Sequence, residues 1–174
     1  MRSREDLYFD LKLVDNLVGS SFPNTKLDIY LTGGAACILA GYLDRATRDF
    51  DFVDRGYVSQ LSKVLKLLEP YDLLTSYFAA IPVNYMERAI KIQGFSHISV
   101  YLFSREDIIA SKIDRLSPKD IEDINVLIAD ADRGMLEEII KETQQNIVYD
   151  DRKERYANNL KKFREIYNLP ERNG

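Results

Sequence analysis

Residues 29–36 read Ile-Tyr-Leu-Thr-Gly-Gly-Ala-Ala, and residues 45–53 read Arg-Ala-Thr-Arg-Asp-Phe-Asp-Phe-Val. The first stretch ends a run of alternating apolar and polar residues at a glycine pair, which predicts a strand, a tight turn and a short buried helix. The second stretch predicts another strand, on which Asp49 and Asp51 project from one face while the phenylalanines point into the core. A glycine pair and a carboxylate pair are therefore expected at neighbouring strand ends.

A glycine pair between a strand and a helix is typical of a phosphate-binding turn. Gly33 and Gly34 let the backbone approach a ligand, and the N-terminus of the next helix offers N–H groups to a phosphate. Asp49 and Asp51 lie about 7 Å apart along a strand, and a divalent cation such as Mg²⁺ relieves their repulsion. Each motif alone also fits a plain turn or an exposed acidic edge. Their order along the chain favours a nucleotide site.

The combined pattern resembles the signature of the polymerase-β-like nucleotidyltransferase superfamily, in which Gly-Gly or Gly-Ser is followed by a helix and Asp-apolar-Asp. The phrase Arg-x-Thr-x-Asp-apolar-Asp is closer still to the AbiE-type abortive-infection toxin nucleotidyltransferases and their bacterial relatives. The resemblance implies that Asp49 and Asp51 hold two Mg²⁺ ions against a triphosphate, whose outer phosphates lie along Gly33 and Gly34. Thr47, two residues before the first aspartate, is expected to orient a carboxylate or a phosphate.

A second match lies downstream, where residues 107–115 read Asp-Ile-Ile-Ala-Ser-Lys-Ile-Asp-Arg and residues 118–124 read Pro-Lys-Asp-Ile-Glu-Asp-Ile. By the same resemblance, Lys112 neutralises triphosphate charge, Asp120 acts on or supports the nucleophile, and Asp123 is a weaker candidate. The residue types alone also fit solvated helix charges and a capping box at the start of the second helix.

Typical members of the superfamily carry a third carboxylate on a later strand. The strand predicted at residues 98–103 has none, and Glu87 and Asp107 are the nearest alternatives, the latter better explained as a helix cap. Either Asp120 supplies the missing group, as in the toxin relatives, or metal binding is impaired.

The remaining periodicities predict an α+β (α/β) protein. The resemblance implies a nucleotidyltransferase fold, in which a mixed β-sheet flanked by helices spans residues 1–104 and a C-terminal helical part over 105–174 packs on it as one compact unit. Residues 81–85 are expected to be irregular. The other predicted elements are helices at 4–18, 35–43, 58–68, 105–115, 118–129, 133–145 and 150–167, and strands at 73–75, 89–92 and 98–103.

Composition indicates an ordinary soluble protein. The 174 residues are 45% hydrophobic and 30% charged, with a net charge of −4. A single cysteine, Cys37, fits a reducing cytosol, and neither a membrane span nor a signal peptide is recognisable. We expect a cytoplasmic location and no membrane partner.

Together with the motifs that carry it, the resemblance implies a metal-dependent nucleotidyltransferase that transfers a nucleotide from a Mg²⁺–NTP to a hydroxyl of tRNA or another RNA, a protein or a small molecule. The resemblance adds a toxin of a bacterial toxin–antitoxin system with a cognate antitoxin as partner. The alternatives are a catalytically impaired binding or regulatory protein of the same fold, and an interaction protein whose helical tail docks a partner.

Overall fold

The computed structural model describes residues 1–57, 63–75 and 79–169. The chain divides into two compact units. We call them the sheet unit (residues 1–75 and 84–104) and the helical unit (residues 76–83 and 105–174).

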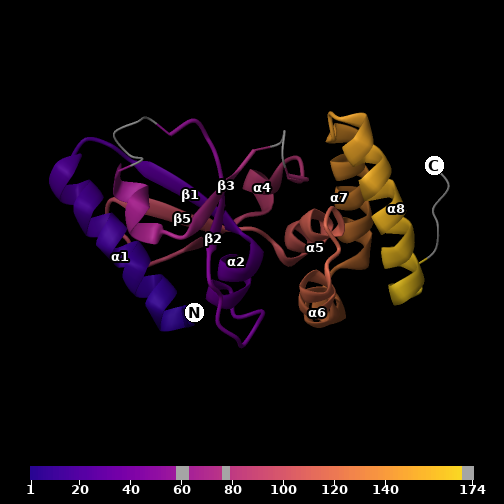
Figure 1. Ribbon diagram of the computed structural model, residues 1–174. Coiled ribbons are helices and arrows are strands. Elements are labelled where there is room, and N and C mark those ends of the chain that lie inside the picture. The colour runs from indigo at the N-terminus through magenta and orange to yellow at the C-terminus, as the bar shows by residue number, and fades with distance from the viewer. Residues whose placement is uncertain (58–62, 76–78, 170–174) are drawn as a thin grey trace. The chain divides into compact units, whose positions relative to one another are not determined.

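The sheet unit is built on one mixed five-stranded sheet with the order β3-β2-β1-β5-β4 (Figure 1). Strand β1 pairs in parallel with β5 and antiparallel with β2, which in turn pairs in parallel with β3. This arrangement confirms the predicted α+β fold with a mixed sheet. In chain order the elements are α1 (Arg4–Ser21), β1 (Leu27–Thr32), α2 (Gly33–Leu39), β2 (Phe50–Val53), η1 (Lys66–Leu68), β3 (Tyr71–Leu74), α4 (Tyr85–Arg88), β4 (Ile90–Ile92) and β5 (Ile98–Leu102).

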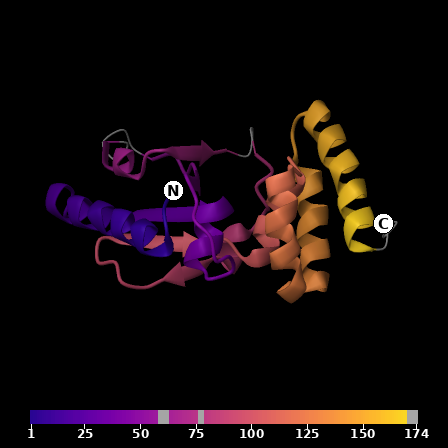
Figure 2. The same cartoon turned by 60° about the horizontal axis from the view of Figure 1, so that its bottom comes forward.

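The two faces of the sheet differ in chemistry because side chains alternate along each strand. One face is apolar: Leu27, Ile29 and Leu31 of β1 are at most 1% exposed, and α1 and α2 pack against this side. Figure 2 shows α1 running alongside the strands. By strand register, the opposite face carries Thr32 of β1 and Asp51 of β2. The apolar face forms the core, and the polar ends of β1 and β2 project from the other side.

A buried carboxylate fixes the entry to β5. Asp15 of α1 is 2% exposed and accepts hydrogen bonds from the backbone N–H groups of Ser96, His97 and Ile98 at 2.6–3.0 Å. Burial alone would raise the pKa of Asp15, but these three donors outweigh it and hold the pKa below its ordinary value. Asp15 therefore remains a carboxylate and anchors the loop before β5 to α1.

The helical unit packs its helices around an aliphatic and aromatic core. The helix α6 begins with the predicted capping box, in which the Ser117 and Asp120 side chains bond each other's backbone, and Pro118 occupies the first turn. Within the described residues, every helix is too short or too polar to cross a membrane. The elements are α5 (Arg105–Ile113), α6 (Pro118–Leu127), η2 (Ile128–Asp130), α7 (Arg133–Asn146) and α8 (Asp150–Tyr167).

Several predicted boundaries differ from the structure, and the helix expected at 35–43 runs from Gly33 to Leu39. The strand expected at 73–75 instead spans Tyr71–Leu74. It includes Asp72, which is in register with Asp51 and so lies on the polar face of the sheet. Part of the segment predicted as irregular joins a single helical turn, α4, which is too short to produce a periodic pattern. Of the helix predicted at 58–68, residues 58–62 lie outside the described part, and its end is a 3₁₀ turn.

Candidate functional site

The carboxylate of Asp51 lies directly over the first glycine of the pair. Thr32 and Asp51 face each other across the antiparallel strands, and Gly33 follows at once as the first residue of α2. A Cβ added to Gly33 would lie 2.1 Å from Oδ2 of Asp51, and the φ of Gly33 is +63°. Both the space and the backbone conformation therefore require glycine. The structure brings the predicted glycine and carboxylate motifs together.

The loop before β2 closes over the second glycine. A Cβ added to Gly34 would lie 2.8 Å from Oγ1 of Thr47 and 3.2 Å from Nη2 of Arg45. Thr47 lies outside β2, in an isolated bridge with the N-terminal segment, so it reaches the glycine pair from a loop and not from the strand. The hydroxyl and the guanidinium thus lie against the backbone where a phosphate was predicted.

The two aspartates of the motif differ in their setting. Strand β2 begins at Phe50, so Asp49 precedes the strand by one residue. The Asp49 side chain is 43% exposed, and Nε of Arg48 lies 4.0 Å from its Oδ1. Asp51 is half-buried against the glycine turn. Both aspartates are thus partly exposed, and Asp51 is the one that lies against the glycine turn.

Arg2 anchors the loop that carries these residues. Its backbone exchanges hydrogen bonds with Thr47 at 2.5 and 3.0 Å, and its Nη1 donates to the carbonyl of Arg48 at 2.6 Å. The guanidinium also pairs with Asp10 of α1 at 2.7 Å and lies over the ring of Phe50. Sequence reasoning missed this residue because nothing local links position 2 to the loop.

A third carboxylate lies beside Asp51. Strands β2 and β3 are parallel with Asp51 in register with Asp72, so the two residues share a face on strands about 4.8 Å apart. The missed signal was the apolar-acid-apolar run from Tyr71 to Leu73, whereas β5 carries no carboxylate, as predicted. Across residues 1–57, 63–75 and 79–169, no three His, Cys, Asp or Glu side chains converge as a ready-made metal site.

Thr32 adds an unexplained polar group at the same place. Its side chain occupies the N-cap position of α2 but makes no capping hydrogen bond. The residue is 3% exposed, and its Oγ1 has no hydrogen-bond partner among the residues described. An unsatisfied buried hydroxyl costs about 1–3 kcal/mol, so such groups are usually explained by a ligand, an ion or water.

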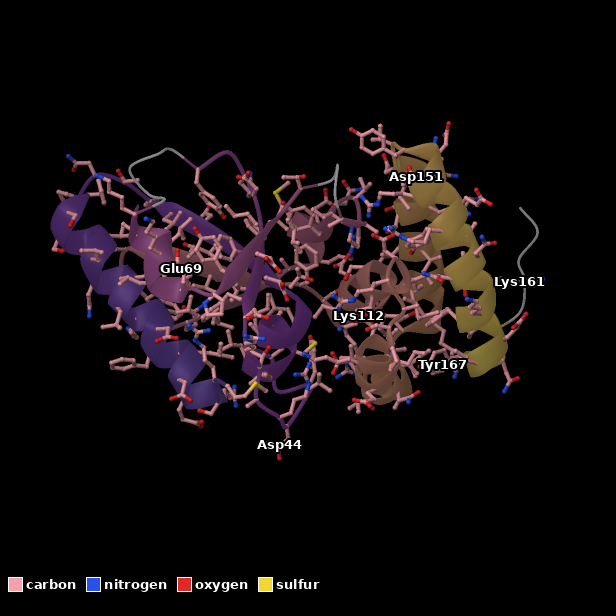
Figure 3. All side chains as sticks on the ribbon, in the orientation of Figure 1. Asp44, Glu69, Lys112, Asp151, Lys161 and Tyr167 are labelled. Atoms are coloured by element: carbon pink, nitrogen blue, oxygen red, sulfur yellow. The ribbon has the colours of Figure 1, made fainter. Side chains whose placement is uncertain are left out.

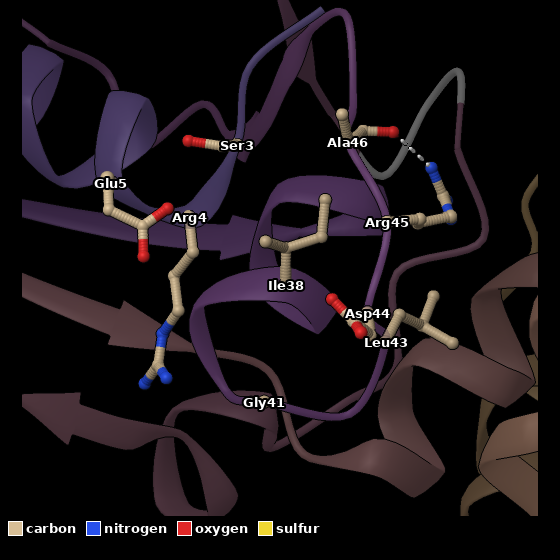
Figure 4. Close-up of a pocket in the computed structure, with 9 residues that line it drawn as sticks. All are labelled: Ser3, Arg4, Glu5, Ile38, Gly41, Leu43, Asp44, Arg45 and Ala46. Carbon is tan, nitrogen blue, oxygen red and sulfur yellow. Dashed lines mark hydrogen bonds between the residues drawn. The ribbon is translucent and has the colours of Figure 1, made fainter.

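A pocket of about 470 Å³ adjoins the loop between α2 and β2 (Figure 4). It lies between the first turn of α1, which contributes Arg4, and the loop residues Leu43 and Arg45, with Ile38 of α2 also lining it. Nη1 of Arg45 donates to the carbonyl of Ala46 at 3.1 Å. Arg45 is thus common to the lining of the pocket and to the surroundings of Gly34.

Lys112 lies in a buried ion cluster within the helical unit (Figure 3). Its Nζ lies 3.0 Å from Oδ1 of Asp120 and 2.8 Å from Oδ2 of Asp123. Arg115 donates to both Asp120 oxygens, and Ser117 donates its backbone N–H and hydroxyl to Oδ2. The three predicted residues of this segment are thus brought together, with Lys112 9% and Asp120 1% exposed at their side chains.

The charges of this cluster stabilise one another. Burial alone would lower the pKa of Lys112, but hydrogen bonds and attraction from Asp123 and Asp120 outweigh it and raise the pKa. Burial would likewise raise the pKa of Asp120, yet the donors around it, Arg115 first, hold the pKa far below its ordinary value. Lys112 is a cation and Asp120 an anion at neutral pH.

The two residues that the sequence offered as alternatives for a third carboxylate lie elsewhere: Asp107 is buried in α5 and Glu87 is exposed on α4.

One family model matches residues 10–169, and its description is "Nucleotidyltransferase of unknown function (DUF6036)". Searches of curated proteins and of solved structures found no match to the chain.

Proposed function

Because the chain belongs to this family of nucleotidyltransferases of unknown function, we propose that the sheet unit binds a Mg²⁺–nucleoside triphosphate and that the protein transfers its nucleotidyl group to an acceptor hydroxyl. The observation that carries the proposal is the Asp51 carboxylate lying on Gly33, where a Cβ would be only 2.1 Å from Oδ2. This close approach places a carboxylate beside a backbone free of side chains. A carboxylate suits a metal ion, and a glycine backbone permits the close approach of a phosphate.

The residues present fit a magnesium ion. Mg²⁺ is usually held by one or two carboxylates and by substrate phosphates, so the absence of a three-residue cluster among the described residues does not conflict with it. Asp49 and Asp51 would hold the metal, which would neutralise phosphate charge and acidify the acceptor hydroxyl. Asp72, in register with Asp51, supplies a third carboxylate on this sheet.

The reaction exchanges one phosphorus–oxygen bond for another. The acceptor oxygen forms a bond to the α-phosphorus, the bond between that phosphorus and the bridging oxygen breaks, and the electron pair leaves with pyrophosphate. The acceptor proton passes to water or to a carboxylate of the site. The chain itself mainly positions the reactants, since phosphoryl-type transfer depends on orientation and charge neutralisation. By the same proposal Gly33 and Gly34 lie along the outer phosphates, and the hydroxyls of Thr47 and Thr32 are available to phosphate oxygens.

Lys112 and Asp120 enter this proposal only through the resemblance. Lys112 retains its positive charge and is proposed to balance the triphosphate. Asp120, whose pKa is held low, is proposed to support Lys112 and not to accept a proton from the nucleophile.

Titration calorimetry with Mg²⁺ and each of the four NTPs tests the site. We expect Mg²⁺-dependent binding in the wild type that is lost in Asp51→Asn. The matched control is Asp28→Asn, because Asp28 is an exposed aspartate on the face of β1 that also carries Thr32. Equal binding by both variants would contradict the proposal.

The acceptor is tested separately with labelled NTP. The AbiE-type resemblance favours RNA, so we propose tRNA as the first acceptor to test. We also propose that a cognate antitoxin inhibits the transfer reaction. Label in the RNA fraction would support this assignment. Label in protein or small molecules would replace it, and NTP binding without transfer to any fraction would support the impaired alternative.

A further inference from the structure

Arg45 is the cation that the sheet unit places on its glycine turn. Its Nη2 lies 3.2 Å from the position of a Cβ on Gly34, and Nη1 is held by the carbonyl of Ala46. Gly34 has no side chain, and this allows the guanidinium to approach the backbone. Arg48, three residues later in the same loop, is a surface charge with a side chain 79% exposed.

The order of charges along the turn is directional. Asp51 lies against Gly33, whereas Arg45 and Thr47 lie against Gly34. A ligand lying along the two glycines would therefore meet a carboxylate, suited to metal, at one end and a guanidinium at the other. A Mg²⁺-bound polyphosphate has this polarity, because the metal neutralises part of the chain and leaves anionic oxygens beyond it.

A guanidinium suits this position better than an ammonium would. Its planar fork of N–H donors matches phosphate oxygens in bidentate geometry. The buried, unpartnered hydroxyl of Thr32, directly before the glycine pair, is a second and independent sign of an absent ligand at this turn.

We propose that Arg45 binds the terminal phosphates of the triphosphate and makes the site selective for nucleoside triphosphates over monophosphates. This inference rests on the proposed function and adds a residue that the resemblance does not assign. The α-phosphate then faces Asp49 and Asp51, and the pyrophosphate leaves on the Arg45 side, next to the pocket that Arg45 also lines.

Calorimetry with Mg²⁺–tripolyphosphate tests the proposal without requiring knowledge of the base. The wild type is compared with Arg45→Ala, Arg45→Lys and the control Arg133→Ala, which removes an exposed arginine at the start of α7. Melting curves verify folding. Loss of a charge-assisted hydrogen bond predicts about 10- to 100-fold weaker tripolyphosphate binding in Arg45→Ala. Arg45→Lys should be intermediate, because it keeps the charge and loses the fork of N–H donors, and Arg133→Ala should bind like the wild type.

A second comparison separates phosphate recognition from a structural role. The NTP that the wild type binds best and its monophosphate are titrated into each variant. We expect Arg45→Ala to lose most of the preference for the triphosphate, whereas a merely structural role would weaken both ligands by the same factor and overturn the inference. If Asp51→Asn abolishes binding but Arg45→Ala behaves like Arg133→Ala, Arg45 is wrongly assigned and the proposed function stands. If the wild type binds neither probe, both are refuted.

Discussion

Replacing Gly33 by alanine tests the geometry on which the nucleotide site depends. Alanine in a left-handed conformation costs about 1–2 kcal/mol, and Gly33 has φ +63°. The new Cβ would also lie 2.1 Å from Oδ2 of Asp51, so the carboxylate must move, and an off-rotamer side chain costs about 0.5–1.5 kcal/mol more. We therefore expect Gly33→Ala to lower the free energy of unfolding by about 1.5–3.5 kcal/mol.

Gly56→Ala is the matched control for this substitution. Gly56 has a similar φ of +73°, but a Cβ there meets nothing within 4 Å. It should lose only the cost of the backbone conformation, and it should bind Mg²⁺–NTP like the wild type. Urea denaturation measures both stabilities, and calorimetry measures binding, which we expect to fall about 10- to 100-fold in Gly33→Ala because Asp51 is displaced. Equal stability losses in the two variants, with unchanged binding in Gly33→Ala, would refute the reasoning.

Three further substitutions test the supports of the fold and site. Asp15→Asn should lower the free energy of unfolding at pH 7 by about 1–3 kcal/mol, because three backbone donors lose their carboxylate. Because folding lowers the pKa of Asp15, its carboxylate stabilises the fold above the unfolded pKa of about 3.9, and this stabilisation is lost as pH falls through the folded pKa. The free energy of unfolding, measured from pH 7 to 2, should therefore fall less steeply with acid in Asp15→Asn than in the wild type. Lys112→Met should destabilise the protein by about 3–5 kcal/mol in urea, because it leaves Asp120 and Asp123 buried without their shared cation. Arg2→Ala should weaken Mg²⁺–NTP binding severalfold in calorimetry, because the aspartate loop loses its anchor; binding equal to that of the wild type would remove Arg2 from the site.

The parts of the fold that the sequence predicts correctly are those with a local signal. Alternating residues identify β1, and the glycine pair marks its end, because no other residue fits the backbone of Gly33. The capping box of α6 is likewise written in four consecutive residues, beginning with Ser117. Local patterns also carry the resemblance that predicts a nucleotidyltransferase. The family match over residues 10–169 confirms this prediction at the level of the nucleotidyltransferase superfamily.

Features that depend on strand order could not be predicted in this way. Asp72 becomes a neighbour of Asp51 only because β3 pairs with β2 in parallel at one particular register, and a shift of one residue would turn Asp72 to the opposite face. The contacts of Arg2 with Thr47 join residues 45 positions apart in the sequence, and they depend on how α1 packs against the sheet. Register and packing are properties of the whole fold, so the local sequence around Asp72 or Arg2 does not reveal which residues will lie beside them.

The Lys112 cluster shows why residue type alone does not assign a role. Two cations, Lys112 and Arg115, face two carboxylates, Asp120 and Asp123, so the charges balance within the helical unit. A phosphate drawn to Lys112 must compete with carboxylates 2.8 and 3.0 Å from its Nζ, and removing the lysine leaves buried anions. Loss of activity in a Lys112 variant would therefore follow from either role. Only a variant that keeps the charge and the stability, such as Lys112→Arg, separates them: a folded protein with normal NTP binding and slow transfer indicates that this lysine acts on the reacting phosphate.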